Sequence, residues 1–313
     1  MILKTLQDAF AYFSDPQRCV DYVVTMRWPD GKVACPTCGS EAVTWLPTRF
    51  LYQCKARHPK RQFSVKVGTI WEDSPIPLGK WLIIGWMMGS CRNGISSYEV
   101  SRTIGIGHKA AWFMLHRIRE GMKAEAKEKL GGCGVEVEVD ECFIGGKSKF
   151  MHKRKRLEAG ITDRGSKKGK VIVQGILERG GEVRTEIVET RSDKLLQGNI
   201  SKHVEPLSCV ITDELHCYRG LPDHFYHQAV NHLEGYVVGR AHTNSLENFW
   251  SCLKRTLKGT YVSVSRRHLT AYVNEQAFRF NCRKGFTEQQ RGIVLLNGIL
   301  GKRLTYRELI ART

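Results

Sequence analysis

Long apolar segments are missing from this sequence. The longest uninterrupted apolar stretch, residues 81–88, is far too short to span a bilayer. Residues 1–8 lack the long apolar core of a secretory signal. We find neither a lipidation motif nor the amphipathic basic helix of a membrane-surface protein. These absences predict a cytoplasmic protein without a membrane partner.

Internal repeats and low-complexity segments are also missing, and the cysteines form only one tight cluster. The chain has 11 cysteines, and those outside the cluster are scattered, as expected for reduced, mostly buried thiols of a cytosolic protein. A hydrophobic fraction of 42% is enough for a sizeable core. The length of 313 residues predicts about two domains.

Acidic residues are too few to balance the basic ones. Lys and Arg total 49 against 31 Asp and Glu, which gives a net charge of +18. Such an excess favours a polyanionic partner, and nucleic acid is the commonest one. We therefore expect a nucleoid-associated location within the cytoplasm.

Residue patterns divide the chain into five segments. Residues 1–30 are aromatic and helical in character, residues 31–72 hold the cysteine cluster with short β-like pieces, and residues 75–130 are typical of helices. Glycines at 131–134 indicate a boundary. Residues 134–285 then alternate strands with helices, and residues 286–313 are expected to form a C-terminal helical tail. The predicted class is α/β.

Four residues in the second segment predict a structural zinc site. Cys35 and Cys38 form a CxxC knuckle, and Cys54 and His58 follow within the next twenty residues. Three thiolates and one imidazole fill a tetrahedral shell, which argues for a structural rather than a catalytic Zn²⁺. A redox pair has the same CxxC spacing, but no βαβ pattern surrounds this one.

The fourth zinc ligand has an alternative interpretation. Zinc ribbons generally close with a second CxxC, and here Arg57 stands where its second Cys would fall. We take His58, one position on, as the substitute. It could instead be a solvated histidine of the basic run 55–61.

Residues 96–122 have the pattern of a helix-turn-helix. Ser96 and Glu99 have capping-box spacing, residues 105–107 supply a glycine-containing turn, and a second helix begins near His108. That helix carries basic residues at Lys109, His116, Arg117 and Arg119, so it could lie in a DNA major groove. An ordinary helical hairpin would give the same pattern.

Two aspartates are expected at the ends of neighbouring strands. Residues 135–140 alternate with period two and end at Asp140. Strands at 171–177 and 183–188 follow, joined by a two-residue glycine turn, then a helix at about 193–203. A strand at 209–212 ends at Asp213, a short strand lies near 229–230, and a helix begins near Thr243. The order is βββαβα.

The last of these helices supplies a third carboxylate. At about 100° per residue, one polar stripe falls within roughly 80°, and it comprises Asn244, Glu247, Ser251, Lys254 and Lys258. Apolar residues fill the opposite side. Carboxylates are the ligands that Mg²⁺ prefers, and two metal ions about 3.5–4 Å apart can cleave a phosphodiester. A merely solvent-exposed face is the alternative.

Jointly these motifs resemble the DDE transposases of bacterial insertion sequences, in the group with an N-terminal zinc ribbon. The likeness rests on Asp140-Glu141, Asp213-Glu214, residues 242–250 and Lys254-Arg255, and it extends through residues 278–283. It implies a ribonuclease H-like catalytic domain and catalytic Mg²⁺ or Mn²⁺. It also implies free 3′-hydroxyl ends that attack target DNA.

The resemblance leaves the third ligand open between two residues. In part of this group the position is Asn, and Asn244 shares the stripe with Glu247. We favour Glu247 because an anion binds Mg²⁺ more strongly than an amide, and because its seven-residue step to Lys254 matches the group. Lys254 could hold a phosphate as a point charge.

The resulting prediction is a DNA transposase acting as a homo-oligomer on double-stranded DNA, namely its terminal inverted repeats and the target. The loop at 147–170, with ten Lys or Arg and two acids, would track phosphates; a disordered solvated insertion is the alternative. Two rival functions remain: a catalytically dead regulator, and a nuclease or junction resolvase that cuts without joining.

Overall fold

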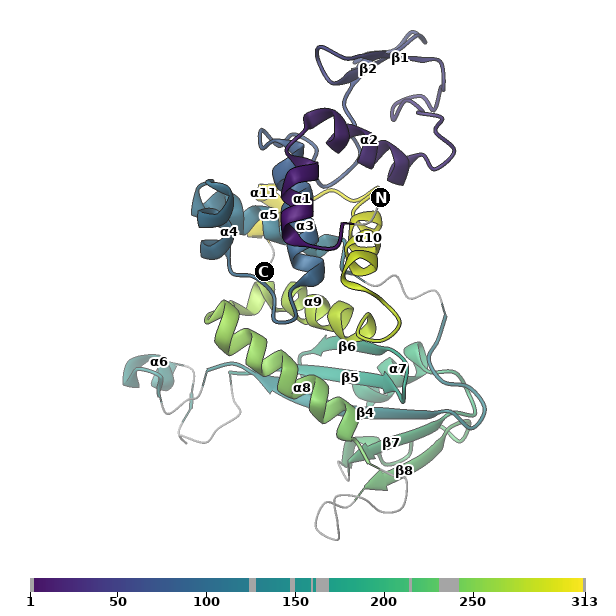
Figure 1. Cartoon of the computed structure of the whole chain (residues 1–313). Coiled ribbons are helices and arrows are strands. Elements are labelled where there is room, and N and C mark those ends of the chain that lie inside the picture. Colours follow the sequence, from purple (N-terminus) through teal and green to yellow (C-terminus); the bar gives the residue numbers. More distant parts are fainter. Residues whose placement is uncertain are drawn as a thin grey trace. The chain divides into compact units, whose positions relative to one another are not determined.

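The chain forms two compact units. The computed structural model describes residues 3–123, 128–146, 150–158, 160–161, 169–213, 216–230 and 242–311. Unit 1 combines residues 1–123 with residues 282–313, and unit 2 spans residues 124–281. Figure 1 colours the chain from a purple N-terminus to a yellow C-terminus. Unit 1 therefore contains both ends of the chain.

Unit 1 opens with two capped helices and a small sheet. Thr5 and Asp8 form a reciprocal capping box on α1 (Leu6–Phe13), and Asp15 caps α2 (Pro16–Arg27). The strands β1 (Val43–Leu46), β2 (Leu51–Cys54) and β3 (Gln62–Phe63) then form an antiparallel sheet. Helices and short strands lie within the ranges predicted for them.

Helix α3 (Leu78–Ser90) is the buried centre of unit 1. Every residue from Trp81 to Gly89 is buried, and α10 (Glu288–Gly298) packs against this helix. The two helices approach so closely at Gly89 that an added Cβ atom there would lie 2.9 Å from the Cα of Gly292. The apolar run 81–88 thus belongs to a protein core. No helix in the described ranges is long and apolar enough to cross a membrane.

Helices α4 (Ser97–Ile104) and α5 (His108–Glu120) pack together across a short turn. The Ser96 hydroxyl accepts from the backbone N–H of Glu99 at 3.2 Å, which starts α4 at the predicted place. Gly105 ends it in the left-handed conformation, with φ +62°. The last helix of unit 1, α11 (Tyr306–Ala311), contacts α5 through the Tyr306 and Phe113 rings.

Three of the four basic residues predicted along α5 do not lie on the surface. His116, Arg117 and Arg119 are buried inside unit 1, and of the four basic residues predicted only Lys109 is exposed. Arg117 donates to the backbone oxygen of Glu72 at 2.6 Å. The periodicity located the helix, but the long basic side chains of its C-terminal half make internal contacts.

A five-stranded sheet forms the centre of unit 2 (Figure 1). Its order is β6 (Val183–Val188), β5 (Val171–Glu178), β4 (Glu136–Ile144), β7 (Cys209–Asp213) and β8 (Tyr226–Val230). Neighbours among β4, β5 and β6 are antiparallel, whereas β7 runs parallel to β4 and to β8. The strands follow the predicted order along the chain.

Helices cover both faces of this sheet. On one face α7 (Asp193–His203) buries Leu196 and Ile200 against Val137 and Val139. On the other, α8 (Asn244–Thr256) and α9 (Leu269–Asn281) build a second core. Short helical turns η2 (His216–Tyr218), η3 (Leu257–Tyr261) and η4 (Arg266–His268) complete the described elements.

The amphipathic prediction for α8 is confirmed. All five residues of the polar stripe are exposed, namely Asn244, Glu247, Ser251, Lys254 and Lys258. The opposite side is buried in the core shared with α9, through Leu246, Phe249, Trp250 and Leu253. One face of α8 therefore seats it on the sheet and leaves the other face open.

Two details of the strands differ from expectation. Asp140 does not end its strand, since β4 continues to Ile144 through pairing with β5. The hairpin loop between β5 and β6 holds three residues rather than two, because Glu178 N–H donates to Glu182 O at 3.0 Å. The side chain of its first residue, Arg179, pairs with Glu136 and Glu138 of the neighbouring strand β4.

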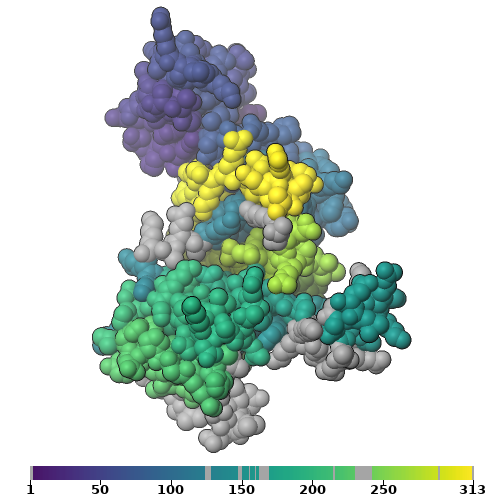
Figure 2. Space-filling model, turned by 180° about the vertical axis from the view of Figure 1, so that it is seen from behind, coloured from purple at the N-terminus to yellow at the C-terminus, as the bar shows by residue number. Residues whose placement is uncertain are grey.

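The basic loop contains one described helix, α6 (Lys153–Glu158), which stands apart from the sheet of unit 2 (Figures 1 and 2). An exposed ion pair joins Arg154 Nε to Glu158 Oε1 at 2.9 Å, and Leu157 is 67% exposed. Residues 147–149, 159 and 162–168 lie outside the described ranges. Phosphate tracking by this loop stays a prediction.

Candidate metal sites

The sequence-predicted zinc ligands come together in unit 1. One donor atom from each of Cys35, Cys38, Cys54 and His58 lies within 4.8 Å of all the others. The sulfur atoms of Cys38 and Cys54 are 3.6 Å apart. Two thiolates of a tetrahedral zinc at about 2.3 Å would be about 3.8 Å apart, so the cluster has the size of a structural zinc site.

The surroundings of the cluster prepare its groups for a metal. Burial raises the pKa of Cys35, but the backbone N–H groups of Thr37 and Cys38, together with the thiols of Cys38 and Cys54, lower it to about 7. His58 Nδ1 lies 2.7 Å from the Pro59 carbonyl oxygen. That bond makes Nδ1 the donor and leaves Nε2, 3.5 Å from the Cys35 sulfur, to face the metal. Arg57 is exposed.

The three predicted carboxylates of unit 2 converge around Asp140. The parallel register of β4 on β7 pairs Glu138 with Ile211, and two further residues along each strand bring Asp140 beside Asp213. Burial raises the pKa of Asp140, and the negative charges of Asp213 and Glu247 raise that pKa further. Both carboxylates therefore lie close enough to Asp140 to repel its charge.

Asp140 is held by two donors. Its Oδ2 accepts from the indole Nε1 of Trp250 at 2.9 Å, and its Oδ1 accepts from the backbone N–H of Glu141 at 2.7 Å. Trp250 belongs to the buried side of α8, so this bond ties α8 to the strand that carries Asp140. Each oxygen keeps a second lone pair for a cation.

The carboxylates are spread more widely than the zinc ligands. Across the described residues, only the Cys/His group gathers three or more donor atoms within such a short distance. Hard oxygen ligands arranged around two ions need a wider spacing, since the ions themselves lie about 3.5–4 Å apart. The charge and the oxygen donors of Asp140, Asp213 and Glu247 fit Mg²⁺ or Mn²⁺.

The remaining candidates on α8 are both exposed. Asn244 begins the helix, and Lys254 lies two turns after Glu247. Burial raises the pKa of the Cys142 thiol, and the nearby charge of Lys254 lowers it in part. Cys142 lies on the same face of β4 as Asp140. A cation therefore stands beside the acidic group.

Sequence reasoning missed two residues next to this group, Glu138 and Arg179. Glu138 is fully buried. Arg179 sits in the glycine turn and binds Glu138 through Nε at 3.1 Å. The alternation of residues 135–140 places Glu138 on the face of Asp140. No local pattern links either residue to α8, which lies over sixty positions farther along the chain.

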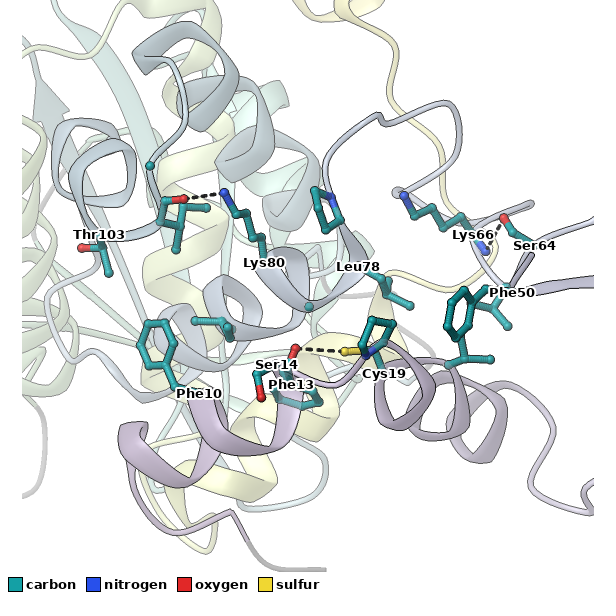
Figure 3. A pocket seen from close by; sticks show the side chains of 18 residues that line it. Phe10, Phe13, Ser14, Cys19, Phe50, Ser64, Lys66, Leu78, Lys80 and Thr103 are labelled. Carbon is teal, nitrogen blue, oxygen red and sulfur yellow. Dashed lines mark hydrogen bonds between the residues drawn. The ribbon is translucent and has the colours of Figure 1, made fainter. Parts of the chain in front are cut away.

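A cavity of about 660 Å³ in unit 1 has a different character (Figure 3). Its walls are mostly apolar, with Phe10, Phe13 and Phe50 among them. Polar groups in its wall are hydrogen-bonded within the protein. Lys80 Nζ donates to the carbonyl oxygen of Ile104 at 2.7 Å, and the Cys19 thiol donates to the carbonyl oxygen of Phe13 at 3.2 Å. This cavity offers no carboxylate among its lining residues.

Comparison with known proteins identifies two domains in this chain. Residues 14–57 match the family model of a transposase zinc-ribbon domain, and residues 129–281 match that of an ISXO2-like transposase domain. The chain is also 26% identical over 275 residues to a protein of Halobacterium salinarum described as an uncharacterized protein in transposable element ISH50. That alignment covers 83% of this chain and 89% of its relative.

Proposed function

The chain belongs to the insertion-sequence transposases in which an ISXO2-like transposase domain follows a transposase zinc ribbon, and we propose that it binds the ends of its own mobile element and performs metal-dependent strand cleavage and strand transfer into target DNA. The observation that carries this proposal is that the negative charges of Asp213 and Glu247 both act on the half-buried carboxylate of Asp140. Three repelling negative charges in one place call for cations.

The proposed catalytic fold is ribonuclease H-like. Three antiparallel strands followed by two parallel ones, in the order β6-β5-β4-β7-β8, support it. In such a fold the first and fourth strands are neighbours, which is the relation of β4 to β7. Two Mg²⁺ or Mn²⁺ ions on Asp140, Asp213 and Glu247 would supply activation of the attacking oxygen and stabilisation of the leaving one.

The chain's own groups position the DNA and the ligands. Trp250 orients the carboxylate of Asp140 through its indole N–H. Lys254, exposed beside the acids, can hold a phosphate next to the scissile bond as a point charge. Asn244 is the rival third ligand on the same helix face. The anionic Glu247 is favoured because its charge reaches Asp140.

DNA recognition is assigned to the modules of unit 1 and to the basic loop. The zinc ribbon and a helix-turn-helix formed by α4 and α5 would read the terminal inverted repeats, with Lys109 exposed at the start of α5. Buried His116, Arg117 and Arg119 are excluded from that surface. We place the protein on double-stranded DNA in the nucleoid, as a homo-oligomer that brings two ends together.

The decisive experiment incubates the purified protein with linear ends of its own element and Mg²⁺, and maps nicks and joined products on a sequencing gel. Asp140→Asn should abolish both products and preserve end binding, because it removes an anionic ligand and keeps the shape. Asp223→Asn, at an exposed acid elsewhere in unit 2, serves as the matched control and should cleave normally.

The same gel separates the rival functions. A regulator with a dead catalytic domain would give no Mg²⁺-dependent product even from the wild-type chain. A nuclease or junction resolvase would nick without joining. Comparison of Glu247→Gln with Asn244→Ala identifies the third ligand, since the larger loss of cleavage marks the residue that holds the ion.

A further inference from the structure

A buried carboxylate of β4 caps the helix that carries Glu247. Glu138 is fully buried, and its Oε2 accepts from the backbone N–H groups of Ser245 and Leu246, both at 3.0 Å. These amides belong to the first turn of α8, where Thr243 makes no side-chain capping bond. Glu138, more than a hundred positions earlier in the chain, thus caps the helix in place of a local N-cap residue and places a carboxylate at the helix N-terminus.

Arg179 balances that charge and holds the chain just before α8. Its Nε donates to Glu138 Oε1 at 3.1 Å, and its Nη1 pairs with Glu136. Its Nη2 donates to the carbonyl oxygen of His242 at 2.8 Å. A buried carboxylate is costly unless it is paired and hydrogen-bonded. Glu138 and Arg179 therefore depend on each other, and together they secure residues 242–246.

This attachment determines where Glu247 lies. Glu247 directly follows Leu246, whose amide is bound to Glu138. Farther along α8, Trp250 is bound to Asp140. These two contacts join α8 to the same face of β4 at two places along the helix. They therefore fix the distance of the helix from the sheet and its rotation about its own axis. The carboxylate of Glu247 is carried to its place beside Asp140 by this pair of anchors.

We propose that Glu138 and Arg179 are positioning residues that hold the first turn of α8 on β4, so that Glu247 and Asp140 can share a divalent metal. The sharing of a metal by Glu247 and Asp140 rests on the proposed function, whereas the attachment of α8 to β4 does not. Glu138 is not itself offered as a ligand. Its two oxygens already receive two backbone amides and the guanidinium, and its side chain is fully buried.

The first test measures amide hydrogen exchange in the full-length protein without DNA or divalent metal. Glu138→Gln should speed exchange of the Ser245 and Leu246 amides by about tenfold, because a neutral acceptor binds them less strongly than a carboxylate. Glu186→Gln is the matched control. It removes another carboxylate of the same unit, which pairs with His203 at 2.8 Å, and should leave these amides unchanged.

The second test measures Mn²⁺ binding by electron paramagnetic resonance and strand cleavage against Mn²⁺ concentration. Glu138→Gln should weaken the Asp140-dependent binding about tenfold, with cleavage recovered at high Mn²⁺ and end binding intact. A folding defect would not be cured by metal. Arg179→Lys keeps a charge beside Glu138 but cannot span to His242, and it should give a smaller shift in the same direction.

The outcomes separate the two ideas. Wild-type exchange at Ser245 and Leu246 in Glu138→Gln, or metal binding equal to wild type in both variants, overturns the positioning role. If Asp140→Asn cleaves normally, the proposed function fails, while the exchange measurement still decides whether Glu138 holds α8. Should Glu138→Gln fail to fold, Arg179→Lys carries both measurements.

Discussion

Gly175 offers a direct test of how α8 is seated on the sheet. It lies on β5 opposite Asp140. A Cβ atom added there would lie 2.7 Å from Trp250 Cζ2 and 2.8 Å from Leu246 Cδ2, against 3.4 Å or more in ordinary contacts. Both neighbours belong to α8, so Gly175→Ala forces this helix away from β5 by about 0.7 Å (3.4 − 2.7).

That displacement has two measurable costs. Overpacking of a core typically destabilises a protein by about 1–3 kcal/mol, which denaturant unfolding can detect. The bond from Trp250 Nε1 to Asp140 Oδ2, now 2.9 Å, would stretch to about 3.6 Å, beyond hydrogen-bond length. Since a misplacement near 1 Å can cost about a hundredfold in rate, we expect strand cleavage to fall roughly 10- to 100-fold, with end binding retained.

Gly198→Ala is the matched control for this prediction. Gly198 is an exposed residue inside α7, and a Cβ atom there would meet nothing within 4 Å. In a helix interior alanine is favoured over glycine by about 0.5–1 kcal/mol, so this variant should be as stable as wild type or more so. Wild-type stability and cleavage in Gly175→Ala would refute the described packing of α8 on β5.

Three further predictions concern zinc, pH and salt. Cys54→Ser should lower bound zinc, measured by elemental analysis, from about one ion per chain to well below one, because one thiolate is lost from the tetrahedral shell; undiminished zinc would exclude Cys54 as a ligand. A hydrogen bond with His203 lowers the pKa of Glu186 from 4.5 to about 2. Burial opposes this shift, and the charge of Lys202 adds to it. The ionised Glu186 therefore stabilises the fold above pH 4.5, and this effect is lost as the pH falls toward 2. Glu186→Gln should lower the free energy of unfolding by about 1–2 kcal/mol at pH 7, after allowance for solvent screening, and should not change it near pH 2. Neutralising residues 153–156 should flatten the plot of log K against log salt by about 0.9 per lost phosphate contact, whereas an unchanged slope in a filter-binding titration would show that this run does not touch DNA.

The patterns of single elements were readable from the sequence because they depend on neighbours within one turn or one strand. Capping at Ser96 located α4, and helical periodicity divided α8 into an exposed stripe and a buried side. The CxxC knuckle with Cys54 and His58 indicated the zinc cluster, since few ligand types satisfy that ion. Local periodicity says less about what a helix packs against, and so the buried Arg117 was misread as a DNA contact.

By itself the sequence indicated the succession of strands along the chain and the amphipathic helix, and it singled out three candidate carboxylates, because each depends on residue type and local spacing. Only the tertiary structure decided how they meet. The parallel pairing of β4 with β7 brings Asp140 beside Asp213, and Glu138 and Trp250 fix α8 on β4. These contacts join residues more than sixty positions apart, and no local preference encodes them. They arise when burial of the two cores selects one packing of helices on the sheet.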